Sequence, residues 1–193
     1  MNFLAHLFLA GDTPESLIGN LAGDFVKGAL RDRFTPAIRD GITAHRRIDS
    51  FTDAHPEVAA FRRVLIPEHG HYSRVIADVF LDHFLASSFE EFANEPLEAF
   101  VARIHETLDE HAAELPGRLR EVYPWMRDQG WLMSYRDVEG VRLTLARMSR
   151  RIERPVDLAA ATHHLTDSRV ELERRFRAFF PEVVAFAESM PSR

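Results

Sequence analysis

Apolar side chains recur at intervals of three and four residues along almost the whole chain, and this helical period is what most restricts its fold. No run of alternating β-branched residues lies between hairpin turn signals, which is the pattern that a half-buried strand requires. The sequence therefore predicts an all-α protein. Proline, glycine and capping residues mark the boundaries, and the expected helices cover residues 2–9, 14–27, 36–53, 71–88, 95–114, 118–127, 135–152 and 156–179, with a further helix beginning at Pro56.

The chain has 193 residues, which is the size of one domain. No linker rich in proline, glycine or serine and no internal repeat divides it, so we expect residues 1–193 to form a single helical bundle. The absence of cysteine excludes disulfides, thiolate catalysis and cysteine-ligated zinc or iron–sulfur centres. It is compatible with a cytoplasmic location, which we expect for this protein.

The charge and the apolar N-terminus restrict the partners. A net charge of −6 argues against a nucleic-acid partner, which requires a basic surface to displace counterions from phosphates. The opening segment MNFLAHLFLAG has no basic leader, contains His6 and is too short to span a bilayer. We therefore expect it to be part of the folded protein and expect no membrane association.

Two carboxylates interrupt an apolar helix face in the segment RVIADVFLDHFLASSF. Asp78 and Asp82 are four residues apart and share that face with Val75 and Leu85. Two buried carboxylates side by side require protonation, cationic partners or a metal ion. A metal or catalytic role is the preferred interpretation, and an ion pair with an arginine is the alternative. His83 points about 100° away and either lines the site or packs beneath it.

A second polar pair lies in SLIGNLAGDF, where Asn20 and Asp24 are again four residues apart. Gly19 and Gly23 accompany them, although glycine inside a helix costs about 1 kcal/mol relative to alanine. The glycines indicate either a tight helix crossing or a ligand close by. Packing alone does not explain Asp24.

A third cluster lies in GITAHRRIDSFTDAH, where His45 and Asp49 share an inward face with two isoleucines. His45 is a candidate metal ligand or acid–base group, and Asp49 is either a second ligand or the group that orients the imidazole. Arg46 and Arg47 flank this face. One of them is a candidate phosphate clamp, and the alternative is that both are solvated surface arginines.

His6 has apolar neighbours on every side, and taken alone it is typical of a core histidine. Together with the other candidates it completes a set of imidazole and carboxylate ligands without sulfur, which suits Mn²⁺, Mg²⁺ or Fe²⁺. That set is His6, Asp24, His45, Asp78 and Asp82. The remaining histidines considered lie on amphipathic segments, and we expect them to face solvent without a role: His105, His111, His163 and His164.

Five motifs, NFLAHL, GNLAGDFVKG, HRRID, DVFLDHFL and WLMSYRD, occur in this order across nearly the whole chain. In this arrangement the sequence resembles the acyl carrier protein phosphodiesterase family. The resemblance implies hydrolysis of the phosphodiester between 4′-phosphopantetheine and a serine of holo-acyl carrier protein, with Mn²⁺ or Mg²⁺, in fatty acid biosynthesis. It also implies a fold divergent from the helical His-Asp metal phosphohydrolases. Here the pair reads Asp82-His83, the reverse of that order.

The predicted mechanism is attack on phosphorus by a water molecule that a divalent cation activates. The predicted metal ligands are His6, Asp24, Asp78 and Asp82. The predicted catalytic residues are His45, Asp49, Asp78 and His83: either aspartate accepts the proton of the water, and either histidine protonates the leaving alkoxide. Asn20, Arg46 and Arg47 are predicted to bind substrate.

A stretch of arginines offers a docking surface for an acidic carrier protein. In RLTLARMSRRIERP this surface comprises Arg142, Arg147, Arg150, Arg151 and Arg154. The alternative is a solvated face that pairs locally with Glu139 and Glu153. Two other functions stay open at this level: a metal-dependent phosphohydrolase of a nucleotide or small phosphoester, and a non-catalytic helical binding protein with buried Asp/His ion pairs.

Overall fold

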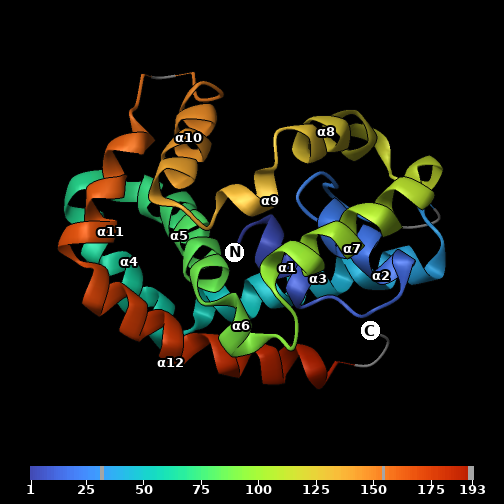
Figure 1. Ribbon diagram of the computed structural model, residues 1–193, viewed down its shortest axis with the longest axis horizontal. Coiled ribbons are helices and arrows are strands. Elements are labelled where there is room, and N and C mark those ends of the chain that lie inside the picture. The colour runs from blue at the N-terminus through green and yellow to red at the C-terminus, as the bar shows by residue number, and fades with distance from the viewer. Residues whose placement is uncertain (31–32, 154, 191–193) are drawn as a thin grey trace.

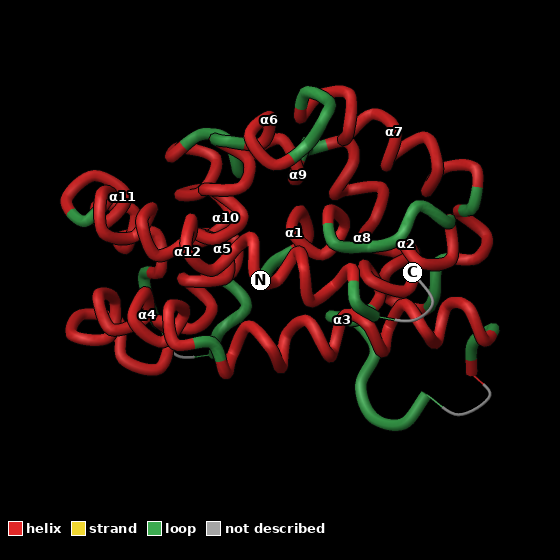
Figure 2. Tube along the Cα trace, turned by 90° about the horizontal axis from the view of Figure 1, so that it is seen from below, coloured by secondary structure: helices red, strands yellow, loops and turns green. Residues whose placement is uncertain are grey.

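The computed structural model describes residues 1–30, 33–153 and 155–190, and all regular structure in these residues is helical (Figures 1 and 2). The predicted all-α class is therefore confirmed. The described helices pack around one hydrophobic core that runs from Met1 to Met190. None of them is both long enough and apolar enough to cross a membrane.

The first helices start where the sequence predicted. The Thr13 hydroxyl accepts a hydrogen bond from the Ser16 N–H, and the Thr35 hydroxyl accepts one from the Ile38 N–H, with a proline after each threonine. The three helices are α1 (Phe3–Phe8), α2 (Pro14–Ala22) and α3 (Pro36–Ala54).

Helix α2 ends five residues before the predicted limit of Lys27. The Arg46 side chain explains this difference, because it donates hydrogen bonds to the carbonyls of Val26 and Gly28, at 3.0 Å each. Gly28 has a positive φ of 76°. The segment after Ala22 is therefore held outside the helix by a side chain from α3.

The middle of the chain forms two long helices joined by one turn. The ring of His55 accepts a hydrogen bond from the Glu57 N–H and caps the first of them. Gly70, with φ of 51°, ends it and leads into a short 3₁₀ turn. These elements are α4 (Pro56–His69), η2 (Gly70–Tyr72) and α5 (Ser73–Ser87).

The C-terminal half holds the largest correction. The single helix predicted for residues 156–179 is three elements, because Asp157 caps a 3₁₀ turn at Ala159 and a second break falls at Ser168. His164, expected to face solvent, is buried and lies beside Glu68 and His69 at the end of α4. The elements are α6 (Phe89–Phe92), α7 (Leu97–Glu110), η3 (Ala112–Glu114), α8 (Gly117–Asp128), α9 (Trp131–Ser134), α10 (Val138–Ser149), η4 (Leu158–His163), α11 (His164–Asp167) and α12 (Arg169–Glu188).

Helix α12 continues nine residues past its predicted end and through Pro181. Proline removes one helical hydrogen bond and clashes with the preceding turn. Burial of the inner face compensates for this cost, since Phe176, Phe180 and Val183 are at most 1% exposed. Figure 1 shows α12 along one edge of the molecule, and it packs against α3, α4 and α5.

Helix α5 is the central element, because it is apolar on nearly every side. It packs against α1, α4 and α10, and its buried residues include Phe80, Phe84 and the carboxylate of Asp82. Figure 1 shows α1 in the interior of the molecule near α5. The N-terminal segment is therefore part of the folded protein, as the sequence predicted, and the structure places it in the core.

Helices α2 and α3 cross very closely at two glycines. A Cβ atom on Gly19 would lie 2.6 Å from the Ile38 carbonyl oxygen and 2.7 Å from the Gly41 Cα. The backbones therefore touch, and the interpretation of Gly19 as a mark of a tight crossing is confirmed. This crossing fixes the position of His45 on α3 relative to Asp24 after α2.

We predict that Gly19→Ala lowers the free energy of unfolding by about 1–3 kcal/mol, because backbone atoms must move apart. At an exposed helical glycine the same substitution would raise the free energy of unfolding, since alanine is the better helix former. Urea unfolding followed by circular dichroism measures the change. Thr43→Ala on the exposed side of α3 is the control, and a stabilised Gly19→Ala protein would contradict the close crossing.

Candidate functional site

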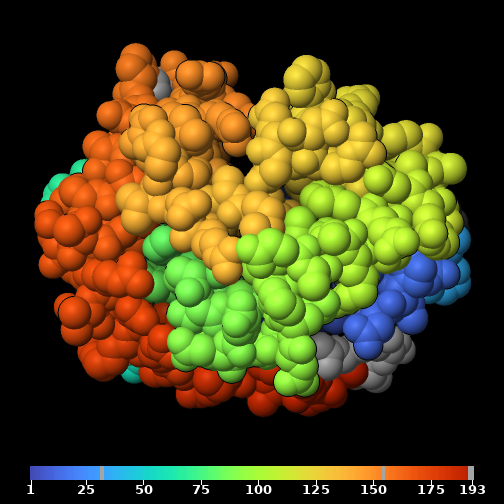
Figure 3. Space-filling model, viewed as in Figure 1, coloured from blue at the N-terminus to red at the C-terminus, as the bar shows by residue number. Residues whose placement is uncertain are grey.

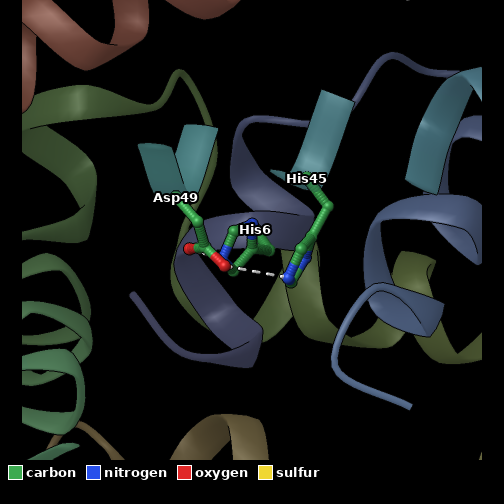
Figure 4. A group of neighbouring side chains, drawn as sticks. All are labelled: His6, His45 and Asp49. Atoms are coloured by element: carbon green, nitrogen blue, oxygen red, sulfur yellow. Dashed lines mark hydrogen bonds and ion pairs between the residues drawn. The ribbon is translucent and has the colours of Figure 1, made fainter. Parts of the chain in front are cut away.

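The side chains of His6, His45 and Asp49 meet at the junction of α1 and α3 (Figure 4). Their ligand atoms all lie within 4.8 Å of one another. The His6 Nε2 is 3.0 Å from one Asp49 carboxylate oxygen, and the His45 Nε2 is 3.2 Å from the other. We refer to these three residues as the His–Asp cluster. Its geometry resembles a set of metal ligands converging on one point.

His45 is held from behind by the C-terminal end of α2. Its Nδ1 lies 2.8 Å from the carbonyl oxygen of Asn20, which can only accept, so Nδ1 carries the proton. The Nε2 then faces Asp49 and also Asp24, whose Oδ1 is 3.7 Å away. Histidine ligands in metal sites are commonly oriented in this way.

The close approach of the His45 ring explains why residue 23 is a glycine. A Cβ atom at Gly23 would lie 2.2 Å from Cγ of the His45 ring. Any larger residue would push the imidazole away from Asp49. Gly23 therefore reflects the close approach of the His45 ring, whereas Gly19 reflects helix packing.

His6 stacks on His45, with ring centroids 3.8 Å apart and an angle of 20° between the rings. Burial and the neighbouring His45 lower the pKa of His6 to about 3, although hydrogen bonding to Asp49 opposes this shift. Its Nδ1 is buried without a hydrogen-bond partner. The ring is therefore a neutral imidazole with unused bonding capacity.

Asp49 joins the two rings and opens the cluster to solvent. Burial favours its neutral form, but the hydrogen bonds with His45 and His6 outweigh this effect and lower its pKa. The carboxylate therefore stays ionised. Its side chain is 41% exposed, whereas those of His6 and His45 are at most 3% exposed. A ligand can therefore reach the cluster from the side of Asp49.

The buried α-ammonium group of Met1 lies among the carboxylates next to the cluster. It donates a hydrogen bond to Asp78 at 3.0 Å and lies 3.6 Å from Asp49. Burial opposes its charged form, but the carboxylates of Asp78, Asp49 and Asp82 raise its pKa to about 10. Burial also raises the pKa of Asp78 and of Asp24. The carboxylates thus form an environment that stabilises a cation.

Asp82 holds the start of α1. Its two oxygens accept hydrogen bonds from the backbone N–H groups of Asn2 at 3.0 Å, Leu4 at 2.8 Å and Ala5 at 3.4 Å. Asn2, the N-cap residue of α1, makes no capping hydrogen bond with its own side chain. Burial raises the pKa of Asp82 to about 7, against the effect of the Met1 ammonium and these N–H groups. A carboxylate from α5 therefore supplies the cap.

His83 follows Asp82 on α5 and points about 100° away from this contact. Its Nδ1 donates a hydrogen bond to the carbonyl of Tyr135 at 2.7 Å, and its Nε2 is buried without a partner. Burial lowers its pKa. His83 does not belong to the His–Asp cluster, and its contacts connect α5 to the end of α9.

The other predicted substrate-binding residues have varied surroundings. The Asn20 side chain donates a hydrogen bond to the Ser16 carbonyl, and its Oδ1 is buried without a partner. Arg46 holds the backbone after α2, as described above. The guanidinium of Arg47 lies over the ring of Phe186, 5.7 Å from the centroid. None of these contacts places an arginine in the His–Asp cluster.

The predicted docking arginines differ in exposure. Arg142 pairs with Glu139 through two hydrogen bonds, which is the local pairing that the alternative interpretation expected. Arg147 lies over the Trp131 ring, 5.8 Å from its centroid. Arg150 and Arg151 are exposed. Arg154 lies outside the described residues.

A pocket of about 50 Å³ lies between α1, α9 and α10. Figure 3 shows the surface hollowed between the orange α10 and the yellow α8. The pocket is lined by Phe3, Trp131, Tyr135, Thr144, Arg147, Met148 and Arg151. Phe3, the first residue of the helix that carries His6, therefore shares this pocket with Arg147 and Arg151.

Tyr135 lies near the acidic residues but was not selected by the sequence analysis, although it belongs to the motif WLMSYRD. It is 1% exposed. Burial raises the pKa of its phenol well above the usual range, and the nearby carboxylates of Asp82 and Asp24 add to this effect. Tyr135 therefore contributes a neutral hydroxyl-bearing ring next to the acidic groups.

The fold and site define an all-helical protein with a partly open cluster of imidazole and carboxylate groups. The family model described as acyl carrier protein phosphodiesterase matches residues 1–183, and the chain belongs to this family. It is 36% identical to an acyl carrier protein phosphodiesterase of Salmonella dublin over 188 residues, covering 97% of each chain.

Two further relatives with the same name, from Salmonella agona (strain SL483) and Escherichia coli O157:H7 (strain EC4115 / EHEC), are 35% identical over 188 residues, again covering 97% of each chain. No solved structure matches the chain. The expected relation to the His-Asp metal phosphohydrolase fold therefore stays a prediction.

We predict that Asp82→Ala lowers the free energy of unfolding by about 2–4 kcal/mol, because it leaves buried N–H groups at the start of α1 without acceptors. Asp82→Asn should lose less, since its carbonyl oxygen still accepts. Urea unfolding measures both values. Asp12→Ala, at an exposed position just after α1, is the control. Equal stability of Asp82→Ala and the unmodified protein would show that this contact does not hold α1.

Proposed function

We propose that this protein hydrolyses the phosphodiester that links 4′-phosphopantetheine to a serine of holo-acyl carrier protein, releasing apo-protein and 4′-phosphopantetheine. Family membership over residues 1–183 supports the reaction. The observation that supports its location is the His–Asp cluster, which is buried on its histidine side and open at Asp49. A phosphodiester substrate on a second protein requires such access from the surface.

His6, His45 and Asp49 fit a divalent cation. Their ligand atoms converge, the Nε2 of His45 is directed at the cluster, and the adjoining carboxylates already hold the positively charged Met1 ammonium. Asp24 is the nearest further carboxylate. Two imidazoles with carboxylates suit Mn²⁺ or Fe²⁺ better than Mg²⁺, which prefers oxygen ligands. When bound, such a cation polarises the phosphoryl group and makes water more acidic.

The predicted roles of two histidines change with this arrangement. The Nδ1 of His45 is bonded to the Asn20 carbonyl, so its Nε2 is the nitrogen that can bind a cation, and this role replaces protonation of the leaving alkoxide. His83 donates its Nδ1 proton to the Tyr135 carbonyl. We assign His45 to cation binding and His83 to positioning α5 against α9.

The aspartates divide between binding and positioning. Asp49 is ionised and bonded to both rings, so we assign it to the cation. Asp78 lies beside the cluster with its side chain 31% exposed, and we assign it to accepting the proton of the attacking water. Both carboxylate oxygens of Asp82 accept hydrogen bonds from the α1 backbone, so we assign Asp82 to positioning His6.

Mass spectrometry of holo-acyl carrier protein incubated with the enzyme and Mn²⁺ tests the reaction. We expect loss of the phosphopantetheine mass, and we expect chelation by EDTA to stop it. Asp49→Asn should lower the rate by about a hundredfold or more. Asp40→Asn, exposed on the same helix, is the matched control.

The possible outcomes separate the competing functions. No change of mass with the unmodified enzyme would refute the proposed substrate, and turnover of a small phosphoester would then support the small-molecule phosphohydrolase. Full activity after chelation or in Asp49→Asn would refute the assigned cation site. A protein that cleaves neither substrate would support the non-catalytic alternative.

We further propose that Arg147, Arg150 and Arg151 contact the acidic carrier protein. Arg142 is neutralised by Glu139, so it contributes less to the surface charge. Arg147 and Arg151 line the pocket beside α1, and Arg150 lies next to them on the exposed surface. A carrier protein held there would have its prosthetic arm close to the helix that carries His6.

We predict that Arg150→Glu raises the KM for holo-acyl carrier protein about tenfold, because it replaces attraction by repulsion. About 0.5 M salt should raise the KM of the unmodified enzyme in the same direction by screening. Turnover of a small aryl phosphodiester should not change. Arg63→Glu, at an exposed position on α4, is the control, and a KM insensitive to both salt and Arg150→Glu would rule out this docking surface.

A further inference from the structure

A second group of ligand atoms lies where the end of α4 meets the junction of η4 and α11. The Nε2 of His163 is 3.4 Å from one carboxylate oxygen of Glu68, and the Nε2 of His164 is 3.7 Å from the other. The three ligand atoms lie within 4.8 Å of one another. Figure 1 shows α4 and α11 side by side. Neither helix carries a residue of the His–Asp cluster.

The Nε2 atom of His164, which faces Glu68, is buried and unpaired. Its side chain is 6% exposed, and its Nε2 has no hydrogen-bond partner among the described residues. Leaving a buried polar atom unpaired costs about 1–3 kcal/mol, so such an atom requires an explanation. His69 lies beside it, with ring centroids 5.4 Å apart, and its Nε2 is also buried and unpaired.

His163 is oriented as ligand histidines usually are. Its Nδ1 donates a hydrogen bond to the carbonyl of Ala160 at 2.8 Å, which places the Nε2 lone pair on the side of Glu68. Hydrogen bonding of the distal nitrogen to a backbone carbonyl is the usual second contact of a histidine that binds metal. His163 and Glu68 are partly exposed, so an ion can enter from solvent.

We propose that Glu68, His163 and His164 bind a divalent transition-metal ion of the Zn²⁺ type. Two imidazoles and one carboxylate without sulfur are a set that Zn²⁺ accepts, with a further position open to water or another donor. His69 is the nearest additional imidazole. The oxygen-preferring ions Mg²⁺ and Ca²⁺ would bind poorly to two imidazoles.

The ion would connect two segments that are far apart in the chain. Glu68 lies in the last turn of α4, and the two histidines lie where η4 passes into α11. Element η4 packs closely against α10, which carries Arg147. The site therefore stabilises the part of the fold that supports the arginine surface, and it needs no part in hydrolysis.

Titration of metal-free protein with Zn²⁺, followed by isothermal calorimetry, tests the proposal. Glu68→Gln and His163→Ala should each bind one ion fewer than the unmodified protein, and Zn²⁺ should raise their Tm less. Both residues are partly exposed, so the variants should fold, which circular dichroism checks. His71→Ala, exposed in the turn after α4, is the matched control and should keep the full number of ions.

A second measurement uses the unmodified protein and does not depend on any variant. In long-range ¹H–¹⁵N spectra of the histidine side chains, Zn²⁺ should shift the Nε2 signals of His163 and His164 but not that of His71. Unmoved His163 and His164 signals at saturating Zn²⁺ would overturn the proposal. The proposal would also be overturned if both Glu68→Gln and His163→Ala bound as many ions as the unmodified protein. This comparison does not depend on which ions the His–Asp cluster binds.

Discussion

The contact between Asp82 and the start of α1 is the interaction on which the site depends. Helix α1 has only six residues and no capping hydrogen bond from its own N-cap side chain, so its conformation is not stable by itself. A carboxylate from the central helix α5 accepts its first N–H groups. This contact places His6 against His45 and brings the Met1 ammonium among the carboxylates. Removing it would disturb both the core and the chemistry.

The two histidines of the cluster are positioned by backbone atoms. The Asn20 carbonyl fixes the tautomer and direction of His45, and Gly23 leaves room for its ring. The Gly19 crossing then sets the distance between α2 and α3. Four helices therefore converge on one site through short-range contacts, which hold the two imidazole rings against the ionised Asp49.

The two groups of metal-type ligands differ in their surroundings. The His–Asp cluster is surrounded by further carboxylates, which stabilise positive charge, as at the Met1 ammonium. The group at Glu68 lies between the end of α4 and the junction of η4 and α11, which also meet through the rings of His69 and His164. The first arrangement suits catalysis, whereas the second suits a structural connection.

The sequence by itself determined the helical class, the helix starts at Thr13 and Thr35 and the shared face of His45 and Asp49, because these features depend on residues three or four apart. The same three- and four-residue spacing identified most of the aspartates and histidines proposed for the site. Tertiary structure alone decided that Asp82 caps α1, that His83 faces Tyr135 and that the helix expected over 156–179 is broken. It also brought Glu68 to His163 and His164, which local pattern had placed in solvent. The spacing of residues along a helix determines which face of the helix a side chain occupies. Packing between segments distant in the chain determines which other residues that face contacts.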